Sequence, residues 1–301
     1  MLAKTIKGVA IILLLSYGLQ AAYNGQAEKD RKGLIKYMEK KFSDPVKNQN
    51  EFFPYYPKNE LKKKFAKGLK KQDFVHGNYA YHKPSKEQKE ELDEFPPYEF
   101  EVDAGEKLFN TPFANGKTYA DCLGGSAVKN KYPYYDTDKD EVVTIEQAIN
   151  ECRTSNGEKP LKWNKGPMAQ ISGYISTQSR GQKVDVKIPS KKAAQAYERG
   201  KEIYYTKRGY LNNSCATCHV QGAGQRVRVE QMSPLLGAAT NYPTYRIKWQ
   251  GLGTLHRRLT GCYRDQGMKP LKSQSAELKE LEYFLTYMSN GLEYFGPDIR
   301  K

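Results

Sequence analysis

Cysteine, histidine and long hydrophobic stretches are all scarce in this chain of 301 residues. There are five cysteines and four histidines. The apolar run near the start, Val9 to Leu15, is much shorter than the roughly 20 residues that a membrane-spanning helix needs. We therefore expect no stable membrane span, and we ask of each cysteine what it does.

The first 22 residues have the pattern of a secretory signal peptide. Lys4 and Lys7 precede the apolar run, and the small residues Ala21 and Ala22 follow it. An uncleaved anchor is the alternative, and with no cysteine after the run a lipoprotein anchor has no attachment point. The prediction is export to the periplasm, where disulfides form.

The chain is strongly basic. Its formal net charge is +15, and removal of Lys4 and Lys7 with the signal peptide leaves +13. Such a charge is typical of nucleic-acid-binding proteins, but export excludes nucleic acid as a partner. An anionic small substrate or an acidic partner protein is the better interpretation.

The sequence "NNSCATCHV" contains Cys215, Cys218 and His219 in the spacing C-x-x-C-H. This spacing is typical of covalent c-type haem attachment, in which two thioethers hold the haem and the histidine binds iron. A zinc site is the competing interpretation, but only His256 and Cys262 could supply its second pair of ligands. The prediction is one covalently bound haem c.

A weak internal repeat precedes this motif. The segment "DAGEKLFN" is similar to "ERGKEIYY", and each carries a glycine, Gly105 or Gly200, that permits close approach of another helix. Gly105 lies 17 residues before Cys122, whereas Gly200 lies 15 and 18 residues before Cys215 and Cys218. Cys122 therefore occupies the place of a haem cysteine in a copy that has lost its haem.

Apolar residues at helical spacing near the end of the chain predict an amphipathic helix that crosses the Gly200 helix: Leu278, Leu281, Leu285 and Met288, with Gly291 as its cap. We predict a mainly α chain with two cytochrome-c-like domains, residues 98–189 without haem and residues 190–301 with haem. Residues 173–190 are interpreted as a loop or short strands between them.

Residues 23–97 form a polar segment with no assigned chemistry. The lysine-rich run at residues 62–71 is interpreted as a solvated surface. The acidic stretch from Ser85 predicts a helix, which Pro96 and Pro97 end.

The second iron ligand has two candidates, Met268 in "DQGMKPL" and Cys262. Cys122 and Cys152 can pair as a disulfide, which leaves Cys262 as an unpaired thiol in an oxidising compartment. A buried inert thiol and an intermolecular disulfide are the plainer interpretations, and Met268 could equally be a packing residue.

Cations surround Cys262, namely His256, Arg257, Arg258 and Arg264. If the stretch is helical, Arg258 lies on the same side as Cys262, four residues earlier. Cations favour the reactive thiolate and bind oxyanions. This favours sulfur redox chemistry over simple electron transfer.

The haem motif, "LHRRLTGCYRD" and "ELEYFLTYMSNGL" together resemble the SoxA subunit of the SoxAX cytochromes, over roughly residues 95–301. The single C-x-x-C-H makes the chain similar to the single-haem members. The resemblance implies two cytochrome-c-like domains and a Cys122–Cys152 disulfide in place of the lost haem. It also implies His219 as proximal ligand and Cys262 as distal ligand, often a persulfide and the proposed catalytic residue.

The resemblance further implies an L-cysteine S-thiosulfotransferase that joins thiosulfate to a cysteine of the carrier protein SoxYZ and releases two electrons. Arg258 would hold thiosulfate, with Arg257 and Arg264 as weaker candidates. The cytochrome SoxX would be the partner subunit, with a third small subunit in some members. The alternative function is an electron-transfer cytochrome with His219 and Met268 as iron ligands, and a structural haem subunit is the third.

Overall fold

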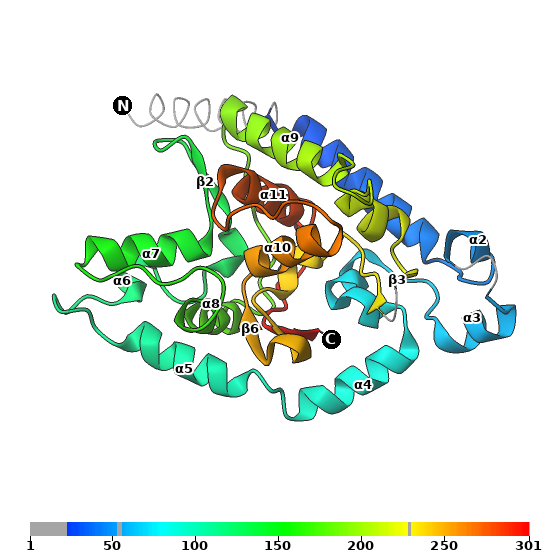
Figure 1. Cartoon of the computed structure of the whole chain (residues 1–301), viewed down its shortest axis with the longest axis horizontal. Coiled ribbons are helices and arrows are strands. Elements are labelled where there is room, and N and C mark those ends of the chain that lie inside the picture. Colours follow the sequence, from blue (N-terminus) through cyan, green and yellow to red (C-terminus); the bar gives the residue numbers. More distant parts are fainter. Residues whose placement is uncertain (1–22, 53–55, 228–229, 301) are drawn as a thin grey trace, which may run out of the picture.

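The computed structural model describes residues 23–52, 56–227 and 230–300 (Figure 1). The predicted signal peptide lies outside these residues. Within them, none of the helices has both the length and the apolar character needed to cross a membrane. Helices dominate the described chain, and its strands form only small sheets of two or three strands, so the predicted mainly α class is confirmed.

A helix over residues 23–41 comes first among the described residues. The elements that follow it are α2 (Gln49–Phe52), α3 (Lys58–Lys64), η1 (Lys71–Ala80), α4 (Lys83–Glu94), α5 (Glu99–Asn110), α6 (Tyr119–Leu123), η2 (Lys129–Lys131), β1 (Tyr134–Asp136), β2 (Glu141–Val143), α7 (Ile145–Ser155), α8 (Pro167–Gln178), α9 (Lys191–Tyr205), η3 (Thr217–Gln221), β3 (Arg226–Val227), β4 (Glu230–Gln231), η4 (Ala238–Asn241), β5 (Thr244–Arg246), η5 (Ile247–Trp249), β6 (Gly251–Gly253), α10 (Leu255–Asp265), α11 (Ala276–Tyr287) and β7 (Asp298–Arg300).

Two helix pairs organise the two halves of the chain. Helix α5 packs along α8, and α9 packs along α11. A Cβ atom at Gly105 would lie 2.0 Å from the Gln170 carbonyl oxygen, and one at Gly200 would lie 2.1 Å from that of Glu280. Only glycine allows the helices to approach this closely, so the predicted role of both glycines is confirmed.

The predicted amphipathic helix near the end of the chain is present as α11. Its apolar positions Leu278, Leu281 and Leu285 are buried, as is Met288 directly after it. The prediction of Gly291 as its cap was wrong, because the helix ends at Tyr287 with Met288 as the C-cap. Gly291, with a positive φ of 79°, lies three residues later.

In each half of the chain, a hairpin and a helix lie in sequence between the two paired helices, and the two halves match in this order. The antiparallel hairpin β1–β2 leads into α7, and β5–β6 leads into α10, with Thr144 and Thr254 as the respective N-caps. A cis peptide bond precedes each hairpin, at Pro133 and at Pro243. The parallel partner β7 adds a third strand to β5 in the second copy.

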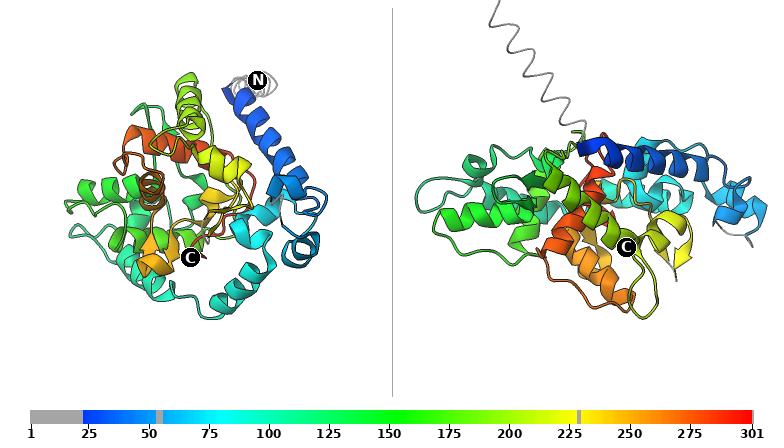
Figure 2. Two further views of the ribbon diagram at one scale, coloured as in Figure 1. Left: turned by 45° about the vertical axis from the view of Figure 1, so that its right-hand side comes forward. Right: turned by 90° about the horizontal axis from the view of Figure 1, so that it is seen from above.

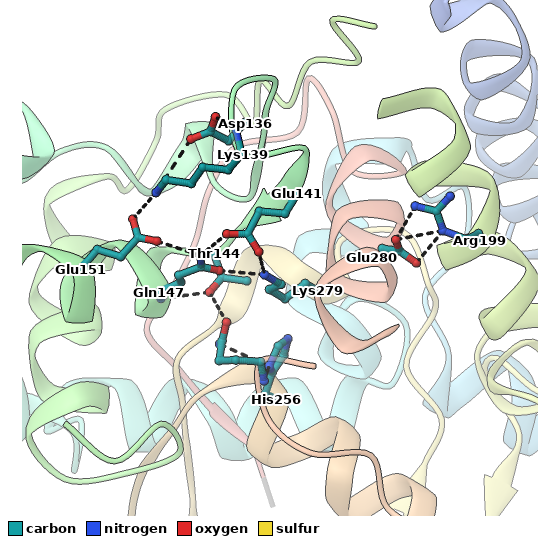
Figure 3. Close-up of polar contacts among 11 residues, drawn as sticks. Asp136, Lys139, Glu141, Thr144, Gln147, Glu151, Arg199, His256, Lys279 and Glu280 are labelled. Atoms are coloured by element: carbon teal, nitrogen blue, oxygen red, sulfur yellow. Dashed lines mark hydrogen bonds and ion pairs between the residues drawn. The ribbon is translucent and has the colours of Figure 1, made fainter. Parts of the chain in front are cut away.

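The two halves contact each other through reciprocal positions. Thr144 Oγ1 donates to Gln274 Oε1 at 2.8 Å, and the Thr254 amide donates to the Asn164 carbonyl at 3.3 Å. Figure 3 shows Thr144 beside a polar network in which Lys279 of α11 contacts Glu141 of β2. Such reciprocal contacts are what a duplicated unit makes with its copy.

The interpretation of residues 173–190 as a loop or short strands was wrong for the first six of these residues. Helix α8 continues to Gln178 because Met168, Ile171 and Ile175 form one buried helical stripe. Residues 179–181 form a turn, and the loop that follows alternates buried side chains at Val184, Val186 and Ile188.

The lysines of the run at residues 62–71 are exposed or partly exposed, as predicted, but other side chains of the N-terminal segment are buried. The segment packs against the C-terminal half on the side opposite the first copy (Figures 1 and 2). Helix α4 ends at Glu94, before Pro96, as predicted. Five of the segment's side chains, each at most 1% exposed, enter the core of the C-terminal half: Met38, Phe42, Leu61, Phe74 and Tyr81.

Candidate functional site

One short helical segment, residues 215–221, contains Cys215, Cys218 and His219. Its last five residues are η3. Its start is fixed by a reciprocal pair of hydrogen bonds, in which the Thr217 amide donates to Ser214 Oγ and the Ser214 amide donates to Thr217 Oγ1. Both cysteines are half-buried free thiols. They are available for two thioether bonds.

His219 is held so that one ring nitrogen remains for a metal. Its Nδ1 lies 2.8 Å from the Ser233 carbonyl oxygen, to which it donates as the protonated nitrogen. This leaves the Nε2 lone pair as the metal-binding group. Burial lowers the pKa of His219, and the nearby Arg258 cation lowers it further, so the imidazole is neutral at pH 7.

Cys262 lies on α10, and the four basic residues near it in the sequence lie on the same helix but have different surroundings. Arg258 is one turn earlier on the same side, and its charge acts on His219 and Tyr242. Its guanidinium also lies 3.8 Å from Asp265. The structure therefore brings Arg258 and Cys262 to the His219 side of the domain.

The other predicted cations have different surroundings. Arg257 stacks on the Trp249 ring at 4.2 Å and donates to the Leu252 carbonyl at 3.2 Å. Arg264 is exposed in the last turn of the helix. His256 is 1% exposed, and its Nε2 lies 3.2 Å from the Glu282 carboxylate, so it stabilises the interior and does not face the thiols.

The three free thiols lie close enough to influence one another. Burial raises the pKa of Cys215 to about 12, and the charge of a Cys262 thiolate is the second largest cause. The same two causes, in the same order, raise the pKa of Cys218. Tyr204 is 2% exposed, and burial together with the charges of all three thiols raises its pKa. Its hydroxyl has no hydrogen-bond partner among the described residues. An unpartnered buried hydroxyl near free thiols fits a site built for a bound prosthetic group.

These side chains do not form a zinc site. Among the described residues, no three side chains of His, Cys, Asp or Glu converge closely enough to hold a metal ion directly. The donors present are two thiols and one imidazole on a short turn, with a further thiol on α10. This set matches the attachment groups and axial ligands of haem c.

Met268 follows α10 in a tight turn, where its amide donates to the Tyr263 carbonyl at 2.8 Å. Its Cγ lies 2.5 Å from the position of a Cβ on Gly209, so the side chain packs on the loop before the haem motif. Glu158 holds the same place in the first copy, within "GEKPLK" against "GMKPLK". The position is thus a turn residue of the repeated unit.

The structure contains the Cys122–Cys152 disulfide, with a Cα–Cα distance of 5.7 Å. The short repeat around Gly105 and Gly200 matches Cys122 to the haem cysteines but gives Cys152 no counterpart in the second copy. The signal was present: from Tyr132 to Gln170, each residue of the first copy corresponds to the residue 110 positions later. In this longer repeat, Cys152 is the counterpart of Cys262.

Comparison with known proteins gives the same result for both halves. The family model described as "SoxA/TsdA, cytochrome c domain" matches residues 104–184 and 199–294. Two relatives are named "L-cysteine S-thiosulfotransferase subunit SoxA". The one from Chlorobaculum tepidum is 53% identical over 234 residues, covering 77% of this chain and 82% of the relative. The one from Allochromatium vinosum is 44% identical over 260 residues, covering 85% and 90%.

A solved structure is also similar. It is titled "Crystal structure of SoxXA from P. pantotrophus" and is 33% identical to this chain with a TM-score of 0.65. The match covers 71% of this chain and 84% of that one. Two cytochrome-c-like domains, as predicted, account for both the internal repeat and these similarities.

Proposed function

This chain belongs to the SoxA family of haem c proteins, and we propose that it is the SoxA subunit of a periplasmic L-cysteine S-thiosulfotransferase with one haem c. The substrate is thiosulfate, and the acceptor is a cysteine of the carrier protein SoxYZ. The cytochrome SoxX is the partner subunit, in keeping with the name of the similar solved complex.

The reaction joins two sulfur atoms. The thiolate of the carrier cysteine and the terminal sulfur of thiosulfate form an S–S bond, which gives a cysteine S-thiosulfonate and releases two electrons. Haem c, when bound, takes up one electron at a time. A second redox centre is therefore needed, and the haem of SoxX supplies it.

The chain's own residues divide the remaining work. Cys215 and Cys218 would hold the haem, and His219 would bind iron through Nε2 because Nδ1 donates to Ser233. Cys262 would be the sulfur-handling group and a second ligand to the iron. Arg258, one turn away on α10, binds the sulfonate oxygens through charge-assisted hydrogen bonds.

The observation that carries this proposal is the half-buried free thiol of Cys262, which lies near Cys215 and Cys218 and one helical turn from Arg258. A plain electron carrier has no use for a thiol there. The position of Met268 against Gly209 gives no support to the alternative with methionine ligation.

The test is a spectrum and an intact mass of the holo-protein, with Cys262→Met as the variant. The mass gives the number of haems and any sulfur added to Cys262, and the spectrum gives the axial ligand. We expect one haem, a thiolate spectrum that the variant loses, and no thiosulfate-dependent turnover in the variant. Full turnover with Cys262→Met would refute the proposal and leave electron transfer as the function.

A further inference from the structure

The hydrogen-bonding geometry of His219 depends on residues that follow it in the chain. Its Nδ1 bonds to the Ser233 carbonyl at 2.8 Å, and its own carbonyl accepts from the Leu235 amide at 2.7 Å. Residues 219–225 and 231–237, called the proximal segments below, therefore set the orientation of the imidazole. Whatever holds the proximal segments in place also holds His219.

The N-terminal segment contacts the first of them through a buried cation. Lys41, at the end of the helix over residues 23–41, is 3% exposed. Its Nζ donates to the Gln221 carbonyl at 2.5 Å and lies 3.5 Å from the Val220 carbonyl. These are the two residues that follow His219, and an ammonium group is buried only where such acceptors offset its desolvation.

The same N-terminal segment contacts the second proximal segment through η1 and the residue after it. Tyr81, 0% exposed, donates its hydroxyl to the Met232 carbonyl. Gly77 has a positive φ of 61°, and a Cβ there would lie 3.5 Å from Ser233 Cβ. A Cβ at Gly237 would lie 2.5 Å from the Phe74 carbonyl oxygen, so the backbones are in direct contact.

These contacts come from a closely packed, buried part of the N-terminal segment. Phe42, the residue after Lys41, stacks on Tyr81 with ring centroids 4.6 Å apart and meets Phe74 edge-on at 5.4 Å. All three rings are at most 1% exposed. One aromatic cluster thus fixes the two side chains, Lys41 and Tyr81, that reach the two proximal segments.

We propose that Lys41 and Tyr81 are positioning residues for His219, which makes the N-terminal segment a part of the haem site. Both residues lie outside the ranges matched by the cytochrome c family model, which begins at residue 104. The proposal rests on haem attachment at Cys215 and Cys218, as in the proposed function, but not on sulfur chemistry at Cys262.

The first experiment compares Lys41→Met with Lys41→Arg and Lys36→Met in the holo-protein. Lys36 is exposed on the same helix, so its variant removes an equal charge without touching a proximal segment. We expect a lower haem midpoint potential in Lys41→Met, because a buried cation favours the reduced, less positive state. Lys41→Arg should restore the potential at least in part, and Lys36→Met should leave it unchanged.

The second experiment measures amide hydrogen exchange in residues 219–225 and 231–237. We expect faster exchange of the first segment in Lys41→Met and of the second in Tyr81→Phe, which loses only a hydroxyl group. Unchanged potential and exchange in both variants would refute the proposal. Neither measurement uses thiosulfate. If the proposed enzymatic activity fails, these two measurements still test the positioning role of Lys41 and Tyr81.

Discussion

Cys152 and Cys262 occupy one and the same position in two copies of a single structural unit. Each is the eighth residue of a helix that begins after a threonine N-cap, α7 in one copy and α10 in the other. Cys152 is bonded to Cys122, whereas Cys262 is a free thiol near Cys215 and Cys218. In the proposed function, the disulfide therefore joins, in the first copy, two positions that in the second copy are a proposed haem cysteine and a free thiol.

Replacing Arg258 with alanine should weaken thiosulfate binding and leave the haem in place. Losing a hydrogen bond to a charged group costs about 1.5–3 kcal/mol, so the thiosulfate KM should rise roughly tenfold to a hundredfold. Steady-state turnover at varied thiosulfate measures it. Arg264→Ala is the matched control, since Arg264 is an exposed arginine on the same helix. An unchanged KM in Arg258→Ala would remove its substrate role.

Removing the disulfide should destabilise the first domain without changing the haem. The bond closes a loop with a sequence separation of 30, for which chain entropy predicts a loss of about 3–4 kcal/mol in the variant with alanine at Cys122 and Cys152. Denaturant unfolding measures the loss, and the visible spectrum reports on the haem. A spectrum that changed at full stability would contradict the assignment of these cysteines to the domain without haem.

The sequence predicted those parts of the site that depend on local spacing. C-x-x-C-H lies on one short turn, so its three residues are neighbours in any fold. Arg258 and Cys262 are four residues apart, which places them on the same side if the stretch "LHRRLTGCYRD" is helical, and this stretch forms α10. Gly105 and Gly200 were found for the same reason, because each lies in a regular helix.

The parts that were missed depend on contacts between distant segments. Lys41 meets Gln221 across 180 residues, and a lysine in a lysine-rich segment is most simply interpreted as solvated. Arg257 and Arg264 lie on the same helix as Cys262. Only the structure shows that Arg257 stacks on Trp249 and that Arg264 is exposed to solvent. Net charge and composition carry no information on either point.

The buried pair of His256 and Glu282 should make stability depend on pH. Burial alone would raise the pKa of the Glu282 carboxyl, but His256 at 3.2 Å and the Lys129 cation lower it below its ordinary value of 4.5. A lowered pKa means that the ionised carboxylate stabilises the fold at every pH above that ordinary value. This contribution is lost as the pH falls through the lowered pKa.

Glu282→Gln should therefore cost about 1–3 kcal/mol in unfolding free energy at pH 7, because buried His256 loses the carboxylate that lies 3.2 Å from its Nε2. The difference from the wild type should shrink as the pH falls well below 4.5. Glu280→Gln is the control: Glu280 lies on the same helix and pairs with the half-exposed Arg199, so its variant should lose about 1 kcal/mol or less. Urea unfolding of the three holo-proteins at pH 7 and at low pH measures both differences. A gap between wild type and Glu282→Gln that stays constant with pH would show that this carboxyl is not ionised in the folded protein.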